Sequence, residues 1–98
     1  MPLFAIIGHD VPDSTENRKI HRPAHFARLQ ALQDQNRLVI AGPNPTAHGE
    51  DSMTGSLLIL DFDDLAQAQA WADAEPFLTG GVYSHVDIKP FVQTLPKK

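Results

Sequence analysis

The sequence predicts one α+β domain in which two helices cover a four-stranded antiparallel sheet, and three observations support this. Short apolar runs alternate with longer polar segments in the order strand, helix, strand, strand, helix, strand. The 98 residues suffice for one small domain, 1–98, and no repeat or linker divides them. The first and third predicted strands are apolar on both faces, which is typical of a sheet that is buried on both sides.

The first strand is expected at residues 3–8, a short apolar run. Residues 13–16 have the spacing of a helix-capping box, an oxygen acceptor followed three residues later by Glu. A helix should therefore follow to about residue 36. Pro23 interrupts it, because a proline removes one backbone hydrogen bond and crowds the preceding turn. We expect either one kinked helix or a short first turn with the main helix starting at Pro23.

Residues 37–41 form the second expected strand, which the Gly- and Pro-rich residues 42–45 should stop. From there to residue 54 the composition predicts a long mobile loop. The Gly and Pro residues of this loop either serve only to make turns, or the loop is a lid over a pocket near His25. The third strand is expected at residues 55–62.

A second helix is expected from a cap at Asp63 or Asp64 to about residue 74. Glu75-Pro76 should end this helix, residues 77–81 should make a turn with room for a short helical piece, and residues 82–89 should form the last strand. The resulting order is the ferredoxin-like βαββαβ arrangement.

The two apolar faces of this sheet also predict an assembly. Two helices cover only one face, and an uncovered apolar face of this size is rare on a monomer. A second copy packed sheet to sheet about a twofold axis is the commonest solution. We therefore expect a dimeric α/β barrel, a homodimer formed through the sheet faces.

Composition and charge argue against several classes of protein. The net charge is −4 and the basic residues are scattered, so nucleic acid is not expected as a partner. The chain has no cysteine, which excludes disulfides and thiolate chemistry. No run is long enough to span a membrane, and the first residues lack the features of a signal peptide. A cytoplasmic protein without a membrane partner is the expectation.

His25 is the strongest candidate for a functional side chain. At about 100° per residue it lies between Leu29 and Leu32 on the apolar stripe of the first helix, so its ring should face the core. Asp10 is the carboxylate best placed by sequence order to accept its Nδ1 proton, which would leave Nε2 free as a general base. The alternative is a structural histidine, satisfied by Asp10 or by a backbone carbonyl.

Five histidines raise the question of a metal site. His21 and His25 are four residues apart on a helix, and His85 and Asp87 share one face of the last strand. His9 lies at a strand end. No HExxH motif or other known ligand spacing is present, so neither a metal nor another cofactor is expected. The absence of a GxSxG motif argues against hydrolysis through an acyl-enzyme.

Several segments, taken together, resemble the YCII-related (YciI-like) family over nearly the whole chain. The resemblance begins with the strand-end Asp10 and continues, in order, through RPAHFARL at 22–29, RLVIAGP at 37–43, TGS at 54–56, AWA at 70–72, EPF at 75–77, GVY at 81–83 and VDIKPF at 86–91. Any one of these motifs would be weak evidence, but their combination and order are specific. The chain departs from the family pattern at Glu75, where the family usually carries Asp.

The resemblance implies a dimeric α/β barrel with an active site built on an Asp–His pair, which falls on Asp10 and His25. One family member dehydrochlorinates a chlorinated hydroxyhydroquinone, and the fold is similar to that of muconolactone isomerases. We expect a cofactor-independent lyase or isomerase in which His25, oriented by Asp10, transfers protons on a small cyclic or aromatic metabolite. The alternative is a dimeric module that binds a small ligand or a partner protein without catalysis.

The same motifs supply the residues that are expected to bind a small-molecule substrate. These are Arg22, Gly42, Pro43, Ser56, Pro76 and Phe77.

Overall fold

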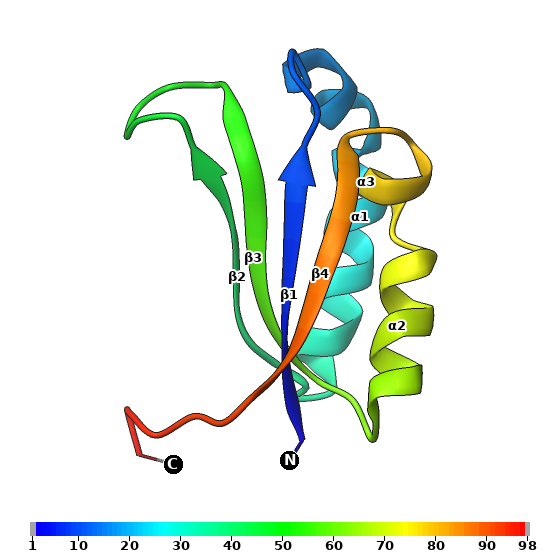
Figure 1. The fold of residues 1–98 in the computed structure, drawn as a ribbon, viewed down its shortest axis with the longest axis vertical. Helices are drawn as coiled ribbons and strands as arrows, with labels where there is room; N and C mark the ends of the chain where they lie inside the picture. Colours follow the sequence, from blue (N-terminus) through cyan, green and yellow to red (C-terminus); the bar gives the residue numbers. More distant parts are fainter. Residues whose placement is uncertain (1, 98) are drawn as a thin grey trace.

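The computed structural model describes residues 2–97 and confirms the predicted α+β ferredoxin-like fold (Figure 1). In chain order the elements are β1 (Leu3–Asp10), α1 (Thr15–Asp34), β2 (Leu38–Pro45), β3 (Met53–Asp61), α2 (Leu65–Asp73), α3 (Pro76–Thr79) and β4 (Tyr83–Phe91). The strands form one antiparallel sheet in the order β2-β3-β1-β4, and the helices lie on one side of it (Figure 1). Within residues 2–97, none of the helices has the length and apolar character needed to cross a membrane.

The main core lies between the helices and one face of the sheet. Alternate residues of β1 and β3 point into it, because successive side chains of a strand face opposite sides. Small side chains on α2 let that helix approach the sheet closely: Ala68 and Ala72 are almost fully buried. The buried core residues are Phe4, Ile6, Leu29, Leu32, Leu58, Leu60, Phe62, Ala68 and Ala72.

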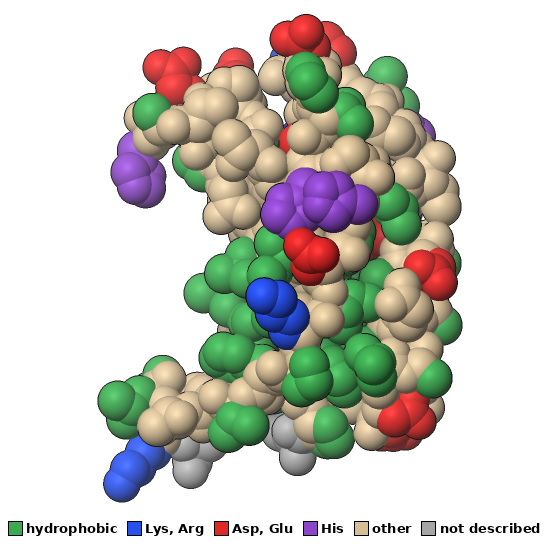
Figure 2. Space-filling model, in the orientation of Figure 1, with side chains coloured by type: hydrophobic (Ala, Val, Ile, Leu, Met, Phe, Trp, Pro, Cys, Tyr) green, Lys and Arg blue, Asp and Glu red, His purple; other side chains and the backbone are tan. Residues whose placement is uncertain are grey.

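The opposite face of the sheet, which we call the open face, carries no helix formed by residues 2–97. Leu3, Ala5 and Ile59 form a second, smaller apolar cluster there. On the same face, Ile40 is 58% exposed and Leu57 is 41% exposed. Figure 2 shows that the molecule is hollowed on this side, between the β2–β3 hairpin and the C-terminal segment, and that hydrophobic side chains line the hollow.

The first helix differs from the prediction at its start and at its proline. α1 is one helix that contains Pro23, so the two-part alternative is wrong. Pro23 is exposed, and the carbonyl that loses its partner there can bond to water. The helix begins after Ser14, whose side chain makes no capping hydrogen bond and donates to Asp10 instead, so the predicted capping box does not form.

The predicted stop of the second strand at residues 42–45 is also wrong. β2 continues through Gly42 and Pro43 to Pro45, and the connecting loop shrinks to residues 46–52. The sheet order explains the error. β2 is an edge strand, where a proline without an N–H group is tolerated because that side of the strand has no partner.

Candidate active site

A pocket of about 380 Å³ opens between α1 and the helix-facing side of β2 and β3. Most of the residues predicted to bind substrate line it, namely Arg22, Gly42, Pro43, Ser56 and Phe77. Pro76 is not part of this wall, because it occupies the first turn of α3 behind Phe77. That a ligand binds to these residues stays a prediction.

His25 lies in the pocket wall and faces inward, as its helical position predicts. It is 8% exposed and its ring stacks on Phe77, with 3.9 Å between ring centroids and 12° between ring planes. Its Nδ1 atom hydrogen-bonds to Oε1 of Glu75. Nε2 has no hydrogen-bond partner among residues 2–97, so it is the ring nitrogen that remains available to a ligand.

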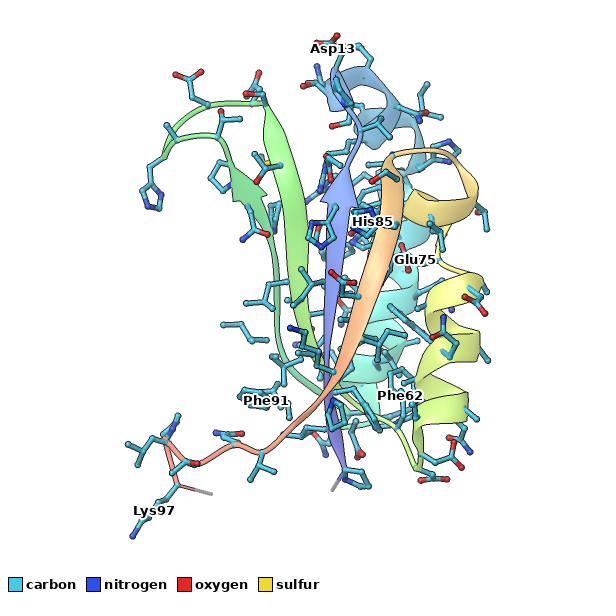
Figure 3. All side chains as sticks on the ribbon, viewed as in Figure 1. Asp13, Phe62, Glu75, His85, Phe91 and Lys97 are labelled. Carbon is cyan, nitrogen blue, oxygen red and sulfur yellow. The ribbon has the colours of Figure 1, made fainter. Side chains whose placement is uncertain are left out.

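The predicted contact between His25 and Asp10 is wrong, because the carboxylate that His25 meets is Glu75. Glu75 is 2% exposed and precedes α3, where its Oε1 also accepts a weak bond from the Phe77 amide at 3.4 Å. Figure 3 shows it on the helical side of the molecule, beside α1. The sequence motif indicated only the end of a helix. The useful signal was the Glu-Pro-Phe motif itself, with its departure from the family's Asp.

Arg28 supports Glu75 from the neighbouring turn of α1. Its Nη1 donates to Glu75 Oε2 at 3.0 Å, and its Nη2 donates to the Trp71 carbonyl at 3.0 Å. The guanidinium also lies over the Trp71 ring, 4.3 Å from the centroid. A buried carboxylate is tolerated only when it is paired and hydrogen-bonded, and here both oxygens of Glu75 have partners.

Asp10 instead holds Arg18. Its side chain is 1% exposed, and it accepts from Arg18 Nε at 2.6 Å, from Arg18 Nη2 at 2.8 Å and from Ser14 Oγ at 2.6 Å. Asp10 does not reach His25 because the two side chains lie at different positions along α1. The end of β1 lies beside the first turns of α1, and His25 is two turns beyond Arg18, about 10 Å at 1.5 Å per residue. A role for Asp10 in catalysis stays a prediction.

Arg18 connects Asp10 to the pocket, because it binds the Asp10 carboxylate and also lines the pocket wall. It lines the pocket wall and donates from Nη2 to Ser56 Oγ and to the Gly55 carbonyl, both at 2.9 Å. Its guanidinium also lies 4.9 Å from the centroid of the Phe77 ring. Arg18 is therefore fixed by contacts on several sides, which gives the pocket a positioned cationic wall.

The remaining charges of the wall are also mostly positive. Lys19 and Arg22 follow Arg18 along α1 and line the pocket with it, opposite Asp51. Within residues 2–97 Arg22 forms no ion pair, and it lies over the Phe26 ring at 5.5 Å. Arg18 pairs with Asp10 and Lys19 with Glu16, so among residues 2–97 Arg22 is the cation of this wall that can pair with an anionic ligand.

Tyr83 packs behind the pocket wall. Its ring meets Phe77 edge to face, with 5.5 Å between centroids, and it occupies the space above Gly8. A Cβ atom on Gly8 would lie 2.4 Å from this ring, so only glycine fits there. The phenol oxygen is buried and forms no hydrogen bond of normal geometry among residues 2–97. Burial raises the pKa of Tyr83 to about 12, against smaller lowering effects of the Ser56 side chain and the charge of Arg18.

The fold and the site define a class of protein: a small ferredoxin-like α+β domain with a buried His–Glu pair beside a cationic pocket of ligand size. Comparison with known proteins gives the particular family. The chain belongs to the YCII-related domain family, whose model matches residues 2–92.

Individual relatives agree with this assignment. Protein YciI of Escherichia coli O6:H1 is 50% identical over 93 residues, which cover 91% of this chain and 95% of the relative. An uncharacterized protein of Haemophilus influenzae is 41% identical over 92 residues, covering 90% of this chain and 94% of the relative. Both matches span nearly the full length of each protein.

Two solved structures share the fold. The 5-chloro-2-hydroxyhydroquinone dehydrochlorinase TftG of Burkholderia phenoliruptrix AC1100, in complex with 2,5-dihydroxybenzoquinone, superimposes with a TM-score of 0.82 at 27% identity, covering 92% of this chain and 93% of TftG. The protein PA3566 of Pseudomonas aeruginosa superimposes with a TM-score of 0.52 at 16% identity, covering 94% of this chain and 93% of PA3566, and this likeness concerns the fold alone.

Proposed function

We propose that this protein is a cofactor-independent enzyme in which His25 is the general acid/base for a small cyclic or aromatic metabolite. The observation that supports this proposal is the hydrogen bonding of the two ring nitrogens of His25. Its Nδ1 is bound to a buried carboxylate, while Nε2, beside the pocket, has no hydrogen-bond partner in the described part of the chain, residues 2–97. A histidine with one nitrogen fixed and the other free is the arrangement that proton transfer requires.

We propose one role for each side chain of the pair, and the contacts support these roles. Glu75 accepts the Nδ1 proton, so the lone pair of the neutral ring lies on Nε2. Nε2 takes a proton from a C–H or O–H group of the substrate, and the ring becomes an imidazolium that Glu75 stabilises. The same nitrogen then returns the proton to product or to water. Such a group contributes typically about 10²–10⁴-fold to the rate, and Arg28 keeps Glu75 in position.

The pocket favours a planar anionic ring as the substrate. Arg18 and Arg22 supply positive charge, and Phe26 and Phe77 supply apolar walls. Hydroxylated quinones and hydroquinones combine a flat ring with acidic oxygens, so they match both features. TftG, which acts on such a ring, supports this class. For a chlorinated ring, removal of a proton by Nε2 lets the ring electrons expel chloride. For a lactone, the returned proton completes an isomerisation.

We also propose that the protein works as a cytoplasmic homodimer. The open face exposes apolar side chains that none of the described helices covers, and Figure 2 shows the hollow that a second sheet would fill. A twofold axis through this face buries the same patch on both copies, as an isologous interface does. The pocket lies on the helical side of the sheet, so dimer formation leaves it accessible.

A non-catalytic binding module is the second candidate, and one observation favours it. The bond between His25 and Glu75 also ties α1 to the start of α3, which is a structural role in its own right. In that case the pocket binds a small ligand and His25 serves stability. The two candidates differ in what happens to turnover when the ring nitrogen is removed.

The test is an activity assay on a panel of chlorinated hydroxyhydroquinones and aromatic-derived lactones, with chloride release and ring absorbance as readouts. We expect the wild-type protein to convert at least one compound. His25→Gln should retain the fold and lose about 10²-fold or more of the rate. The matched control is His48→Gln, in the exposed loop between β2 and β3, which should keep full activity. Equal rates in both variants would exclude His25 as the acid/base.

A further inference from the structure

A cluster of two histidines and one aspartate lies on the open face, away from the pocket. His9 of β1 and His85 of β4 are direct cross-strand neighbours, and their rings stack with centroids 4.3 Å apart and 9° between planes. His9 Nε2 is 2.8 Å from Asp87 Oδ2. Figure 2 shows histidine side chains with an acidic group against them, and Figure 3 places His85 on β4. The proposed reaction uses none of these residues.

The hydrogen bonds of His85 leave one of its nitrogens ready for a ligand. Ser84 Oγ donates to the His9 carbonyl at 3.2 Å and lies 2.8 Å from His85 Nδ1. A hydroxyl has only one hydrogen, so Nδ1–H of His85 must be the donor in the second contact. The lone pair of the His85 ring is then on Nε2. This is how proteins orient a metal-binding imidazole, with an outer hydrogen bond fixing the tautomer.

His9 and Asp87 form the other half of the cluster. His9 Nε2 donates its proton to Asp87 Oδ2, so these two potential ligand atoms are already neighbours with a single proton between them. A cation that takes the place of this proton gains both atoms as ligands, and the ring proton of His9 moves to Nδ1. The ligand atoms of the three residues all lie within 4.8 Å of one another.

We propose that His9, His85 and Asp87 bind a divalent transition-metal ion of the zinc class. Zinc lies about 2.0–2.2 Å from imidazole nitrogen and carboxylate oxygen, which sets its ligand atoms roughly 3.3 Å apart in a tetrahedron. Rotation of these partly exposed side chains closes the remaining gap, while the paired strands hold the Cα atoms fixed. Two imidazoles and one carboxylate select zinc, nickel or copper over calcium or magnesium, which prefer all-oxygen sites.

The test is calorimetric titration of the full-length protein with zinc chloride, after removal of bound metal by a chelator and dialysis. We expect one zinc ion per chain at this site. His9→Gln, His85→Gln and Asp87→Asn should each weaken that binding at least tenfold, since even outer-shell changes cost about that much. His48→Gln is the control, and it should bind zinc as the wild type does. Parallel titrations with calcium and magnesium chloride should show no binding at the cluster.

Two results would overturn the metal site. One is a wild-type protein that binds no zinc at millimolar concentration. The other is zinc binding that all three cluster variants retain at wild-type affinity, which would place the ion elsewhere. Calcium binding as tight as zinc binding would contradict the role given to the imidazoles. All three side chains lie near the surface, and circular dichroism of each variant checks that its fold is intact.

Discussion

The Nδ1 atom of His25 and the Oε1 atom of Glu75 form a hydrogen bond although 50 residues separate them in the chain. This contact links the middle of α1 to the start of α3, and both side chains are buried. It also decides which nitrogen of His25 is left for chemistry. Glu75 therefore affects both the stability of the fold and the chemistry proposed for His25.

Glu75→Ala should destabilise the protein strongly. The change leaves the Nδ1 group of His25 and the guanidinium of Arg28 without their partner, and breaking a buried pair in this way costs about 3–5 kcal/mol. Urea unfolding measures this loss in the free energy of unfolding. Glu50→Ala, in the exposed loop, should change it by less than about 0.5 kcal/mol. A similar loss in both variants would contradict the structural role of Glu75.

Glu75→Asp probes the length of the side chain at this position. The carboxylate is kept but is one methylene shorter, so it cannot reach both His25 and Arg28 with the backbone unchanged. We expect a folded variant with reduced turnover and a smaller loss of stability than Glu75→Ala. If Glu75→Asp is as stable and as active as the wild type, contact of one carboxylate with both His25 and Arg28 is not what stabilises this region.

Asp10→Asn should weaken ligand binding more than it affects the chemical step. Asp10 contacts Arg18, and Arg18 lines the pocket, so the variant loosens a cationic wall and leaves His25 in place. We expect KM for an anionic substrate to rise roughly tenfold, which corresponds to about 1.4 kcal/mol, with a much smaller change in kcat. Asp34→Asn, at the exposed end of α1, is the control. A fall in kcat with KM unchanged would indicate that Asp10 takes part directly in the chemical step.

Tyr83 should make stability depend on pH in alkaline solution. Burial raises the pKa of Tyr83 from 10.0 to about 12, so the unfolded chain loses the phenol proton at lower pH than the folded protein does. This stabilising contribution is complete below pH 10 and is lost as the pH rises from 10 to 12, by about 2–3 kcal/mol in all. Tyr83 is the only tyrosine, so phenolate absorbance reports its titration directly. A midpoint near pH 10 would contradict its burial.

Tyr83→Phe separates this effect from other alkaline titrations. The variant should lack the fall in unfolding free energy that the phenol causes between pH 10 and 12. At neutral pH it should be at least as stable as the wild type, because the phenol oxygen has no hydrogen-bond partner to lose among residues 2–97. Urea unfolding at several pH values compares the two proteins.

Leu57→Glu should break the proposed homodimer. Leu57 lies on the open face, where a charged side chain would be buried against the second sheet without a partner. Sedimentation equilibrium should give a dimer for the wild type and a monomer for the variant. Leu65→Glu is the matched control, since Leu65 is 51% exposed on α2, and it should stay dimeric. A monomeric wild type would refute the dimer.

Local sequence patterns were sufficient to predict the elements and their order, because β1 and β3 contain apolar runs, β4 alternates apolar and polar residues over most of its length, and α2 has a cap at Asp64. They failed where position in the sheet matters more than local preference. Pro43 and Pro45 resemble a strand stop, yet they belong to β2 because an edge strand tolerates them. No local pattern states which strand will lie at the edge.

In the candidate site, local sequence patterns predict the orientation of His25 but not its partner. The period of α1 shows that His25 faces inward, because that follows from residues within two turns of it. Its partner depends on how α3 packs against α1, which sequence order does not reveal. Asp10 is nearer in the chain, but Glu75 is nearer in space. The neighbouring positions of His9 and His85 depend in the same way on the register between β1 and β4.

The role of His25 as a base positioned by Glu75 is best tested by the ¹⁵N NMR spectrum of the His25 ring near neutral pH, before and after addition of 2,5-dihydroxybenzoquinone. We expect a proton on Nδ1, where Glu75 accepts it, and a free Nε2 whose signal shifts when the ligand binds. Glu75→Gln should alter the Nδ1 signal first. A proton on Nε2, or a His25 ring that saturating ligand leaves unchanged, would refute this role.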